Sequence, residues 1–370
     1  MIADAARFGA YAEAIAAAVR PGNTVAEIGC GPGVFSMLAC RAGARRVYAI
    51  ESQDIIAFAR TLAAVNGFSG QIEFLQSDSQ KAELPERVNV VVSDIRGALP
   101  LFQDAIPSLE DARKRFLAPR GIMIPQCDTL KAAVMEDDAY YGRIVSPWRE
   151  PVAGLDLSSP ILPALNQIYA RYFQKNQFLT QAENWGVLDY TTGAAPDVSA
   201  EMNFHVERAG TGHGLCLWFE TKLFDGIGYS AGPGTSSVHG QRFLPWLEPV
   251  AFEQGEEIRV AIKANLVGRE YIWQWETRIP ESSRHGETHF RQSTFQGANY
   301  SLQWIRRKAA DYVPALSETG KADLWMMERM NGSTSLQEIA KSTTERFPEL
   351  FPSWQEAFQR AADLSSEFSR

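Results

Sequence analysis

Cysteine is scarce in this sequence. The four cysteines are scattered along the chain and form no Cys-x-x-Cys pair. Such pairs are typical of zinc sites and redox motifs, and disulfide-stabilised domains are usually short and dense in cysteine. In a chain of 370 residues we therefore expect reduced thiols and no disulfide framework (Cys30, Cys40, Cys127 and Cys216).

Histidine is also scarce, with five residues in the chain. His285 and His289 have the four-residue spacing of two metal ligands on a helix. However, they follow a loop-like stretch at residues 280–284 and lack a third ligand. His205 and His213 are expected to be packing or surface residues. We therefore predict no metal site.

Long apolar runs and an excess of basic residues are both absent. The chain has 36 Lys and Arg against 44 Asp and Glu, a net charge of −8. A broad basic surface for nucleic acid is therefore not expected. No uncharged apolar run approaches the ~18 residues that span a bilayer, and the N-terminus lacks a basic-then-apolar signal pattern. We expect a cytoplasmic protein with no nucleic-acid or membrane partner.

The first third of the sequence does contain a regular alternation of short apolar strands and helices. Such an alternation predicts a parallel sheet with right-handed crossovers. The predicted strands lie at residues 24–28, 46–50, 72–75 and 88–92, and the predicted helices at residues 1–20, 34–41 and 55–65.

The periodicity changes near Pro125. From about residue 130 to about residue 300, apolar residues alternate at a two-residue period between Pro and Gly residues, which is typical of an antiparallel sandwich or barrel. A chain of this length is expected to form two or three domains. We place them at residues 1–126, 127–305 and 306–370.

The last part of the sequence has a helical pattern. Residues 309–330 and 334–368 are predicted helices, interrupted by Asn331-Gly332. Ser333 or Ser335 is expected to cap the N-terminus of the helix that contains Leu336–Ile339.

A glycine loop follows the first predicted strand. Val25-Ala26-Glu27-Ile28 leads into Gly29-Cys30-Gly31-Pro32-Gly33, where glycines let the backbone approach a ligand. The Gly-x-Gly-x-Gly spacing differs from the Gly-x-Gly-x-x-Gly of dinucleotide folds, and S-adenosylmethionine has no pyrophosphate to cradle. Glu51 ends the second strand 18 residues after Gly33, and a carboxylate there can accept both ribose hydroxyls.

These features predict a site for S-adenosylmethionine, with S-adenosylhomocysteine as the product. Asp78 and Ser79 follow the third predicted strand, where the adenine amino group is expected to lie. The candidate cofactor residues from this part of the argument are Glu27, Gly29, Gly31, Gly33, Glu51, Ser52, Asp78, Ser79 and Ser93.

Several segments together resemble the protein arginine methyltransferases over roughly residues 1–300. They are Met1–Arg7 with Tyr11, Ala42–Glu51, Leu84–Val88, Phe116–Gly121, Trp246–Pro249 and Gly255–Ile258. The resemblance implies a Rossmann-type class I methyltransferase domain followed by an antiparallel β-barrel domain. It also implies that Arg7 pairs with the carboxylate of the cofactor's methionine part.

The loop after the fourth strand departs from that family. The family holds a substrate guanidinium between two glutamates, and Asp94 and Gln103 fall on their positions. A guanidinium is always charged, and losing one buried countercharge costs about 3–5 kcal/mol. Asp104, Glu110 or Asp111 could compensate for the missing carboxylate.

A second departure lies in the expected barrel, where the family's Thr-His-Trp loop is matched only by Val238-His239-Gly240. His239 is expected to orient Asp94 or to take a proton. The candidate catalytic residues are therefore Asp94, Gln103 and His239. The family's dimerisation arm is not recognisable, although residues 160–200 could contain one, so a homodimer is left open.

The last 65 residues or so do not resemble that family. Leu316–Gly320, Leu324–Met327 and Met330–Ala340 resemble the helical part of a PqqD-like winged-helix module, a type of module that binds leader peptides of ribosomally made natural products. The other interpretation is a helical cap that packs on the barrel.

The expected function is that of an S-adenosylmethionine-dependent methyltransferase. The first hypothesis is methyl transfer to an arginine-like nitrogen of a protein or peptide. The second is transfer to a carboxylate, amine or hydroxyl of a peptide or small metabolite, which the altered Asp94 and Gln103 positions favour. The third is a non-catalytic cofactor-binding scaffold, against which the intact glycine loop and Glu51 argue.

Overall fold

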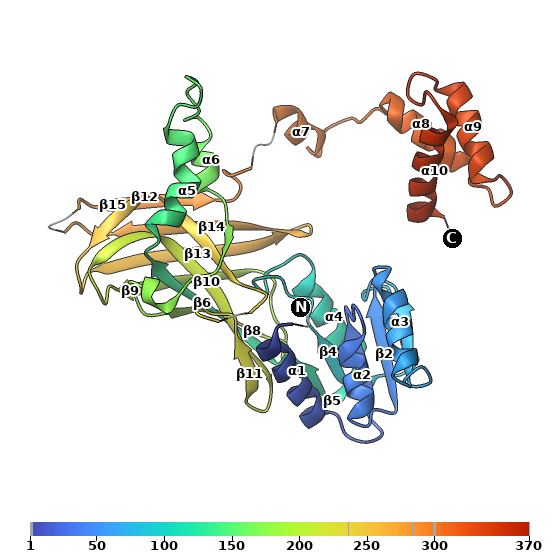
Figure 1. Cartoon of the computed structure of the whole chain (residues 1–370), viewed down its shortest axis with the longest axis horizontal. Coiled ribbons are helices and arrows are strands. Elements are labelled where there is room, and N and C mark those ends of the chain that lie inside the picture. Colours follow the sequence, from blue (N-terminus) through green and yellow to red (C-terminus); the bar gives the residue numbers. More distant parts are fainter. Residues whose placement is uncertain (1–2, 236, 283–284, 299–300, 370) are drawn as a thin grey trace. The chain divides into compact units, whose positions relative to one another are not determined.

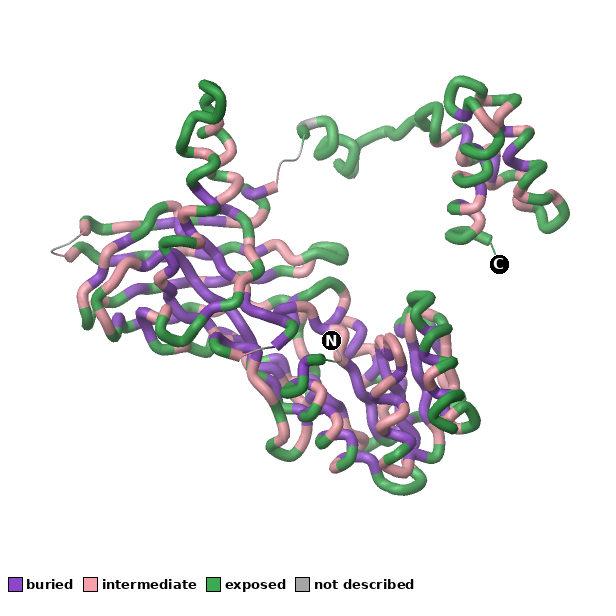
Figure 2. The backbone as a smooth tube through the Cα atoms, in the orientation of Figure 1, coloured by how far each residue is buried: buried purple, intermediate pink, exposed green. Residues whose placement is uncertain are grey.

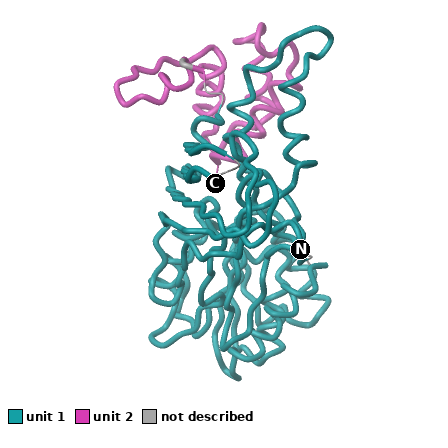
Figure 3. The backbone as a smooth tube through the Cα atoms, turned by 90° about the vertical axis from the view of Figure 1, so that its left-hand side faces the viewer, with its two compact units in different colours: residues 1–299 teal, residues 300–370 magenta. Residues whose placement is uncertain are grey.

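The computed structural model describes residues 3–235, 237–282, 285–298 and 301–369. Met1 and Ile2, which contribute to the arginine methyltransferase resemblance, lie outside the described residues. The chain forms two compact units, residues 1–299 and residues 300–370 (Figure 3). The expected domain divisions at residues 126 and 305 stay predictions.

A five-stranded parallel sheet forms the first part of the larger unit (Figure 1). Its order is β3-β2-β1-β4-β5, so the order along the sheet reverses between β1 and β4. Ligands of open α/β sheets bind outside the carboxyl ends of the strands at such a reversal. The strands are β1 (Thr24–Ile28), β2 (Arg46–Glu51), β3 (Ile72–Gln76), β4 (Val88–Ser93) and β5 (Leu117–Ile124).

Four helices accompany this sheet: α1 (Ala5–Ala18), α2 (Val34–Arg41), α3 (Ile55–Val65) and α4 (Ala105–Arg115). The side chain of Asp4 caps α1 by accepting a hydrogen bond from the Arg7 backbone. The buried residues of α1 include Tyr11 and Ile15, one helical turn apart, so this face packs inward. The predicted parallel sheet is confirmed.

Two antiparallel sheets form the rest of the larger unit. The first has the order β7-β12-β10-β6-β8, with β11 paired to β10, and the second has the order β15-β14-β13-β9. Their strands are β6 (Cys127–Met135), β7 (Tyr169–Arg171), β8 (Glu183–Asp189), β9 (Val198–His205), β10 (Gly210–Phe224), β11 (Ile227–Ser230), β12 (Gln241–Phe252), β13 (Glu257–Val267), β14 (Glu270–Ile279) and β15 (Thr288–Ser293).

The core of these two sheets is rich in aromatic residues. Trp185, Trp246 and Trp275 are among the largest fully buried side chains, and buried residues follow the strands of both regions (Figure 2). The predicted antiparallel domain is confirmed as a fold class. In the described residues, its strands pair into two separate sheets rather than one closed barrel.

Two helices that the sequence analysis did not predict, α5 (Asp138–Arg149) and α6 (Ile161–Leu165), lie between β6 and β7 (Figure 1). A short 3-10 helix follows at Lys175–Gln177. No helix in the described part of the chain is both long and apolar enough to cross a bilayer.

The smaller unit contains α7 (Leu302–Arg307), α8 (Glu318–Glu328), α9 (Leu336–Arg346) and α10 (Trp354–Phe368). The predicted helix at 309–330 begins later, because Ser317 caps α8. The predicted helix at 334–368 is two helices. Ser335 caps α9 in a capping box with Glu338, which settles the choice between Ser333 and Ser335.

Candidate active site

The glycine loop requires glycine at the positions where the backbone turns. Gly29, Gly31 and Gly33 have φ angles of 70°, 49° and 73°, which side-chain-bearing residues rarely adopt. A Cβ atom on Gly29 would clash with Cγ2 of Ile95. Gly33 precedes α2 and lies close to Ala59, so it shapes the loop where the helix begins.

Two cavities flank this loop at the carboxyl ends of the parallel strands. Each has a volume of about 250 Å³, and Gly29 and Glu51 line both of them. Together they offer an elongated site around the loop. The first contains Ser52, Asp78, Ser79 and Gln103, and the second contains Arg7, Glu27, Gly31 and Asp94.

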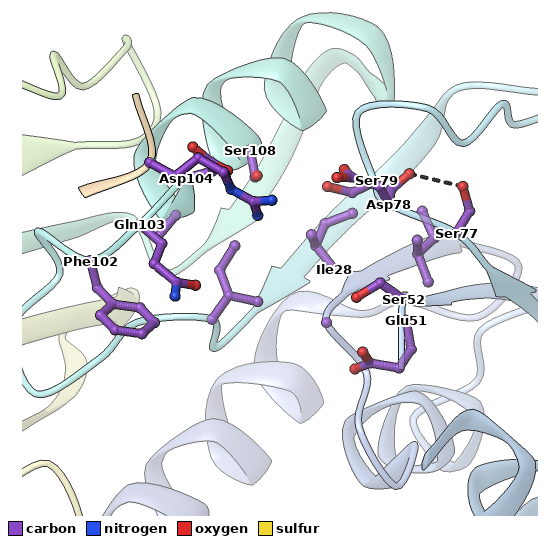
Figure 4. Close-up of a pocket in the computed structure, with 15 residues that line it drawn as sticks. Ile28, Glu51, Ser52, Ser77, Asp78, Ser79, Phe102, Gln103, Asp104 and Ser108 are labelled. Carbon is purple, nitrogen blue, oxygen red and sulfur yellow. Dashed lines mark hydrogen bonds and ion pairs between the residues drawn. The ribbon is translucent and has the colours of Figure 1, made fainter. Parts of the chain in front are cut away.

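Glu51 lies between the two cavities and is held by the backbone. Oε2 accepts a hydrogen bond from the Gly31 N–H at 2.9 Å, and Oε1 accepts one from the Gln53 N–H at 2.9 Å. A carboxylate has further lone pairs to offer. Figure 4 shows Glu51, Ser52 and Asp78 on one side of the first cavity, with Gln103 on the other. The structure therefore brings these predicted cofactor residues together.

Glu27 and Ser93 are both buried at the strand ends. Burial raises the pKa of Glu27 from 4.5 to about 8, although hydrogen bonding from Ser36 opposes the rise. Glu27 is therefore largely protonated at neutral pH. The Ser93 hydroxyl donates to the Ile28 carbonyl at 2.9 Å. This contact joins β4 to β1, and the predicted contact between Ser93 and the cofactor stays a prediction.

Asp94 forms ion pairs with two guanidinium groups of the chain itself. Oδ2 accepts a hydrogen bond from Arg7, and Oδ1 lies 3.2 Å from Nη2 of Arg96. All three side chains are at most 6% exposed. Both carboxylate oxygens, which an acceptor guanidinium would need, already have cationic partners.

Arg96 is the residue of this site that the sequence analysis missed. Its Nη1 lies 2.5 Å from Asp128. Its Nη2 donates to the hydroxyl groups of Tyr11 at 2.7 Å and Tyr229 at 3.0 Å. The sequence could have indicated Arg96, because this charged residue stands between Ile95 and the apolar run Gly97-Ala98-Leu99. A charge in such a segment needs a buried partner.

The three predicted catalytic residues line three different cavities. Gln103 lies in the first cavity beside Asp104 (Figure 4), and Asp94 lines the second. His239 lines a third cavity, and its Nε2 lies 3.3 Å from the Tyr229 hydroxyl. Burial lowers the pKa of His239 below its ordinary value of 6.5. Its imidazole is therefore mainly neutral at pH 7.

The acidic residues that could replace the missing carboxylate have other partners. Asp104 pairs with Arg269 at 2.5 Å. Glu110 pairs with Arg113 and Lys114, and Asp111 pairs with Arg115, all on α4. No group of three or more potential metal ligands is found among the described residues, and His289 instead contacts Glu276.

Comparison with known proteins shows which sequences this chain is similar to. Residues 20–179 match a family model described as a methyltransferase domain. The probable protein arginine N-methyltransferase 6 of Arabidopsis thaliana is 30% identical over 247 residues, covering 64% of this chain and 56% of that protein. The protein arginine N-methyltransferase 6 of Xenopus laevis is 28% identical over 283 residues, covering 72% of this chain and 81% of that protein.

The chain is thus similar to methyltransferase domains over residues 20–179 and to protein arginine methyltransferases over a longer stretch.

Solved structures support the same fold for the methyltransferase domain and the sheets that follow it. A Trypanosoma brucei structure, described as a PRMT1 enzyme-prozyme heterotetrameric complex with AdoHcy, has a TM-score of 0.74 at 21% identity and covers 79% of this chain and 96% of that chain. Protein arginine methyltransferase 10 of Arabidopsis thaliana has a TM-score of 0.69 at 20% identity, covering 79% and 95%.

The chain spans little more than half the length of two of the curated relatives that it matches. It covers 56% of the first Arabidopsis protein and 59% of protein arginine N-methyltransferase 1.1 from the same organism.

Proposed function

We propose that the protein is an S-adenosylmethionine-dependent methyltransferase whose acceptor is a nucleophile other than an arginine guanidinium. The cofactor part rests on the two cavities that share Gly29 and Glu51. The adenosine part would lie along Glu51, Ser52 and Asp78, and the methionine part would lie near Arg7. Gly31 supports this fit, because it lines the second cavity and has open space where a Cβ would stand, so the backbone can approach a ligand there.

The acceptor part of the proposal rests on the occupied carboxylate of Asp94. A substrate guanidinium would add a third positive charge beside Arg7 and Arg96, and like charges at close range repel. If Arg7 turned to the carboxylate of the cofactor, it would free one carboxylate oxygen of Asp94. Arg96 would remain, because Asp128, Tyr11, Thr221 and Tyr229 also hold it.

The chemistry then depends on alignment. S-adenosylmethionine supplies an electrophilic methyl group when bound. The chain holds the acceptor in line with that methyl and excludes water, and correct alignment of reacting atoms can account for a large part of a rate enhancement. Asp94 would act as a positioning residue through its ion pairs. His239, mainly neutral at pH 7, would be able to accept a proton from an amine or hydroxyl acceptor.

Arginine methylation is the competing function, and the names of the curated relatives favour it. Methyl-labelled S-adenosylmethionine incubated with an arginine-rich peptide distinguishes the two. We expect no labelling of that peptide by the protein or by its Gln103→Glu variant, because Gln103 lies in a different cavity from Asp94. Arginine labelling by the unmodified protein would contradict the proposal.

We propose that the C-terminal unit is a folding unit with a core of its own. Its core consists of Ala322, Met326, Ile339, Ala340, Phe351, Ala357, Ala361 and Leu364, all from its own helices and connecting segments. No strand is present in residues 301–369, so the PqqD-like resemblance, which covers helices only, stays a prediction.

A further inference from the structure

The third cavity opens beside the loop that carries Asp94. It has a volume of about 400 Å³, within the usual range for ligand sites. Arg96 connects it to the Asp94 cluster, because the same side chain lines the cavity and pairs with Asp94. Arg171, His239 and Arg242 also line it.

The lining of this cavity contains three arginines and no acidic residue. Arg96 is neutralised by Asp94 and Asp128, and Arg171 lies 3.2 Å from Asp137. Arg242 differs from both: with the described residues, its guanidinium forms neither an ion pair nor a hydrogen bond. It is half-buried on β12, and burial lowers its pKa.

A guanidinium that is partly withdrawn from water without a counterion is unfavourable. The cost is offset when an anion binds, and a carboxylate can take two parallel hydrogen bonds from a guanidinium. The cavity has room for an acidic side chain together with a neighbouring group, and its walls contribute no competing carboxylate.

We infer that the third cavity binds the acceptor through a carboxylate, with Arg242 as the specificity-determining partner. This inference rests on the proposed methyltransferase function and names the chemical class of its acceptor. The carboxylate can belong to an acidic peptide or to a small free acid, and both present the same group to Arg242. An arginine-rich acceptor would meet like charge in this cavity.

The test measures the fluorescence anisotropy of labelled hexaglutamate and hexalysine peptides with the full chain in the presence of S-adenosylhomocysteine. We expect the hexaglutamate peptide to bind more tightly. Arg242→Gln should weaken its binding about ten- to a hundredfold, the range for a hydrogen bond to a charged group. Arg242→Lys should retain most of the affinity, and Arg242→Glu should shift the preference to hexalysine.

Arg259→Gln is the matched control, because Arg259 is exposed on β13 and does not line this cavity. The Arg259→Gln variant should bind hexaglutamate with the same affinity as the unmodified protein. Near-ultraviolet circular dichroism confirms that each variant is folded. Competition with free glutarate distinguishes the two sources: displacement at low concentration indicates a small acid, and displacement only by unlabelled hexaglutamate indicates an acidic peptide.

Equal binding of the two peptides, or an Arg242→Gln variant that binds hexaglutamate normally, would overturn the inference. Calorimetric titration of the same preparations with S-adenosylhomocysteine is independent of this result. Loss of the peptide preference with cofactor binding intact would reject only the inference. Absence of cofactor binding would instead reject the proposed function.

Discussion

Arg96 and Asp128 form a buried ion pair that joins the loop after β4 to strand β6. The distance from Nη1 to Oδ1 is 2.5 Å, and the two side chains are 1% and 0% exposed. The Tyr190 hydroxyl donates to the second oxygen of Asp128 at 2.8 Å. The pair therefore links the parallel sheet to the antiparallel sheets, at the position where Arg96 also contacts Asp94.

Replacing Arg96 should destabilise this junction. Arg96→Met leaves Asp128 buried without its cation, which costs about 3–5 kcal/mol. The measurement is the urea midpoint of the full chain. Arg45→Gln provides the control, because Arg45 pairs with Glu86 at the surface and such pairs contribute about 1 kcal/mol or less. Equal midpoints for the two variants would show that the buried pair does not stabilise the junction.

Glu27 should make stability depend on pH. Its pKa is about 8 in the folded protein against 4.5 ordinarily. Between these values the folded state retains a proton that the unfolded state has released. The free energy of unfolding therefore falls as pH rises through this window, by up to about 1.4 kcal/mol per unit, and levels off above pH 8.

Glu27→Gln removes this titration. Urea midpoints measured from pH 5 to pH 8 should show the variant becoming progressively more stable relative to the unmodified protein. Glu73→Gln is a suitable control, since Glu73 pairs with Arg46 near the surface. Parallel midpoint curves for Glu27→Gln and the unmodified protein would show that Glu27 does not retain its proton on folding.

Local patterns predicted the parallel sheet well. The structure has β1, α2 and α3 at the predicted bounds, because apolar runs separated by glycine turns specify such elements locally. The helices α5 and α6 were not predicted. A helix predicted from residue 309 begins at Glu318, since the cap at Ser317 determines where it starts.

The arrangement of the candidate site depends on contacts that local patterns do not encode. Arg7 and Asp94 are 87 residues apart in the sequence, and Arg96 and Thr221 are 125 residues apart. The structure gives Gln103 a φ of 43° and a position in the first cavity, while Asp94 lines the second, so the joint role that the resemblance implies for them stays a prediction. The role of Arg96 requires the buried Asp128, which only the fold brings close.

Glu51 should determine cofactor affinity. Glu51→Gln removes one charged acceptor and gives the side chain a donor, so the Kd for S-adenosylhomocysteine should rise about ten- to a hundredfold. Glu86→Gln is the control, because Glu86 lines neither cofactor cavity. An unchanged Kd for Glu51→Gln would place the ribose elsewhere.

The C-terminal unit should unfold separately from the cofactor site. Met326 is fully buried in its core, and Met→Ala in a core costs about 2–5 kcal/mol. Hydrogen exchange followed by mass spectrometry should show faster exchange in residues 318–368 of Met326→Ala. The Kd for S-adenosylhomocysteine should not change. A weakened Kd would indicate that the tail contributes to the cofactor site.

Calorimetric titration of the purified full chain with S-adenosylhomocysteine tests the central claim most directly. The two cavities around Gly29 and Glu51 predict one binding site per chain, from which S-adenosylmethionine displaces the product. A folded protein that takes up neither compound would contradict the account.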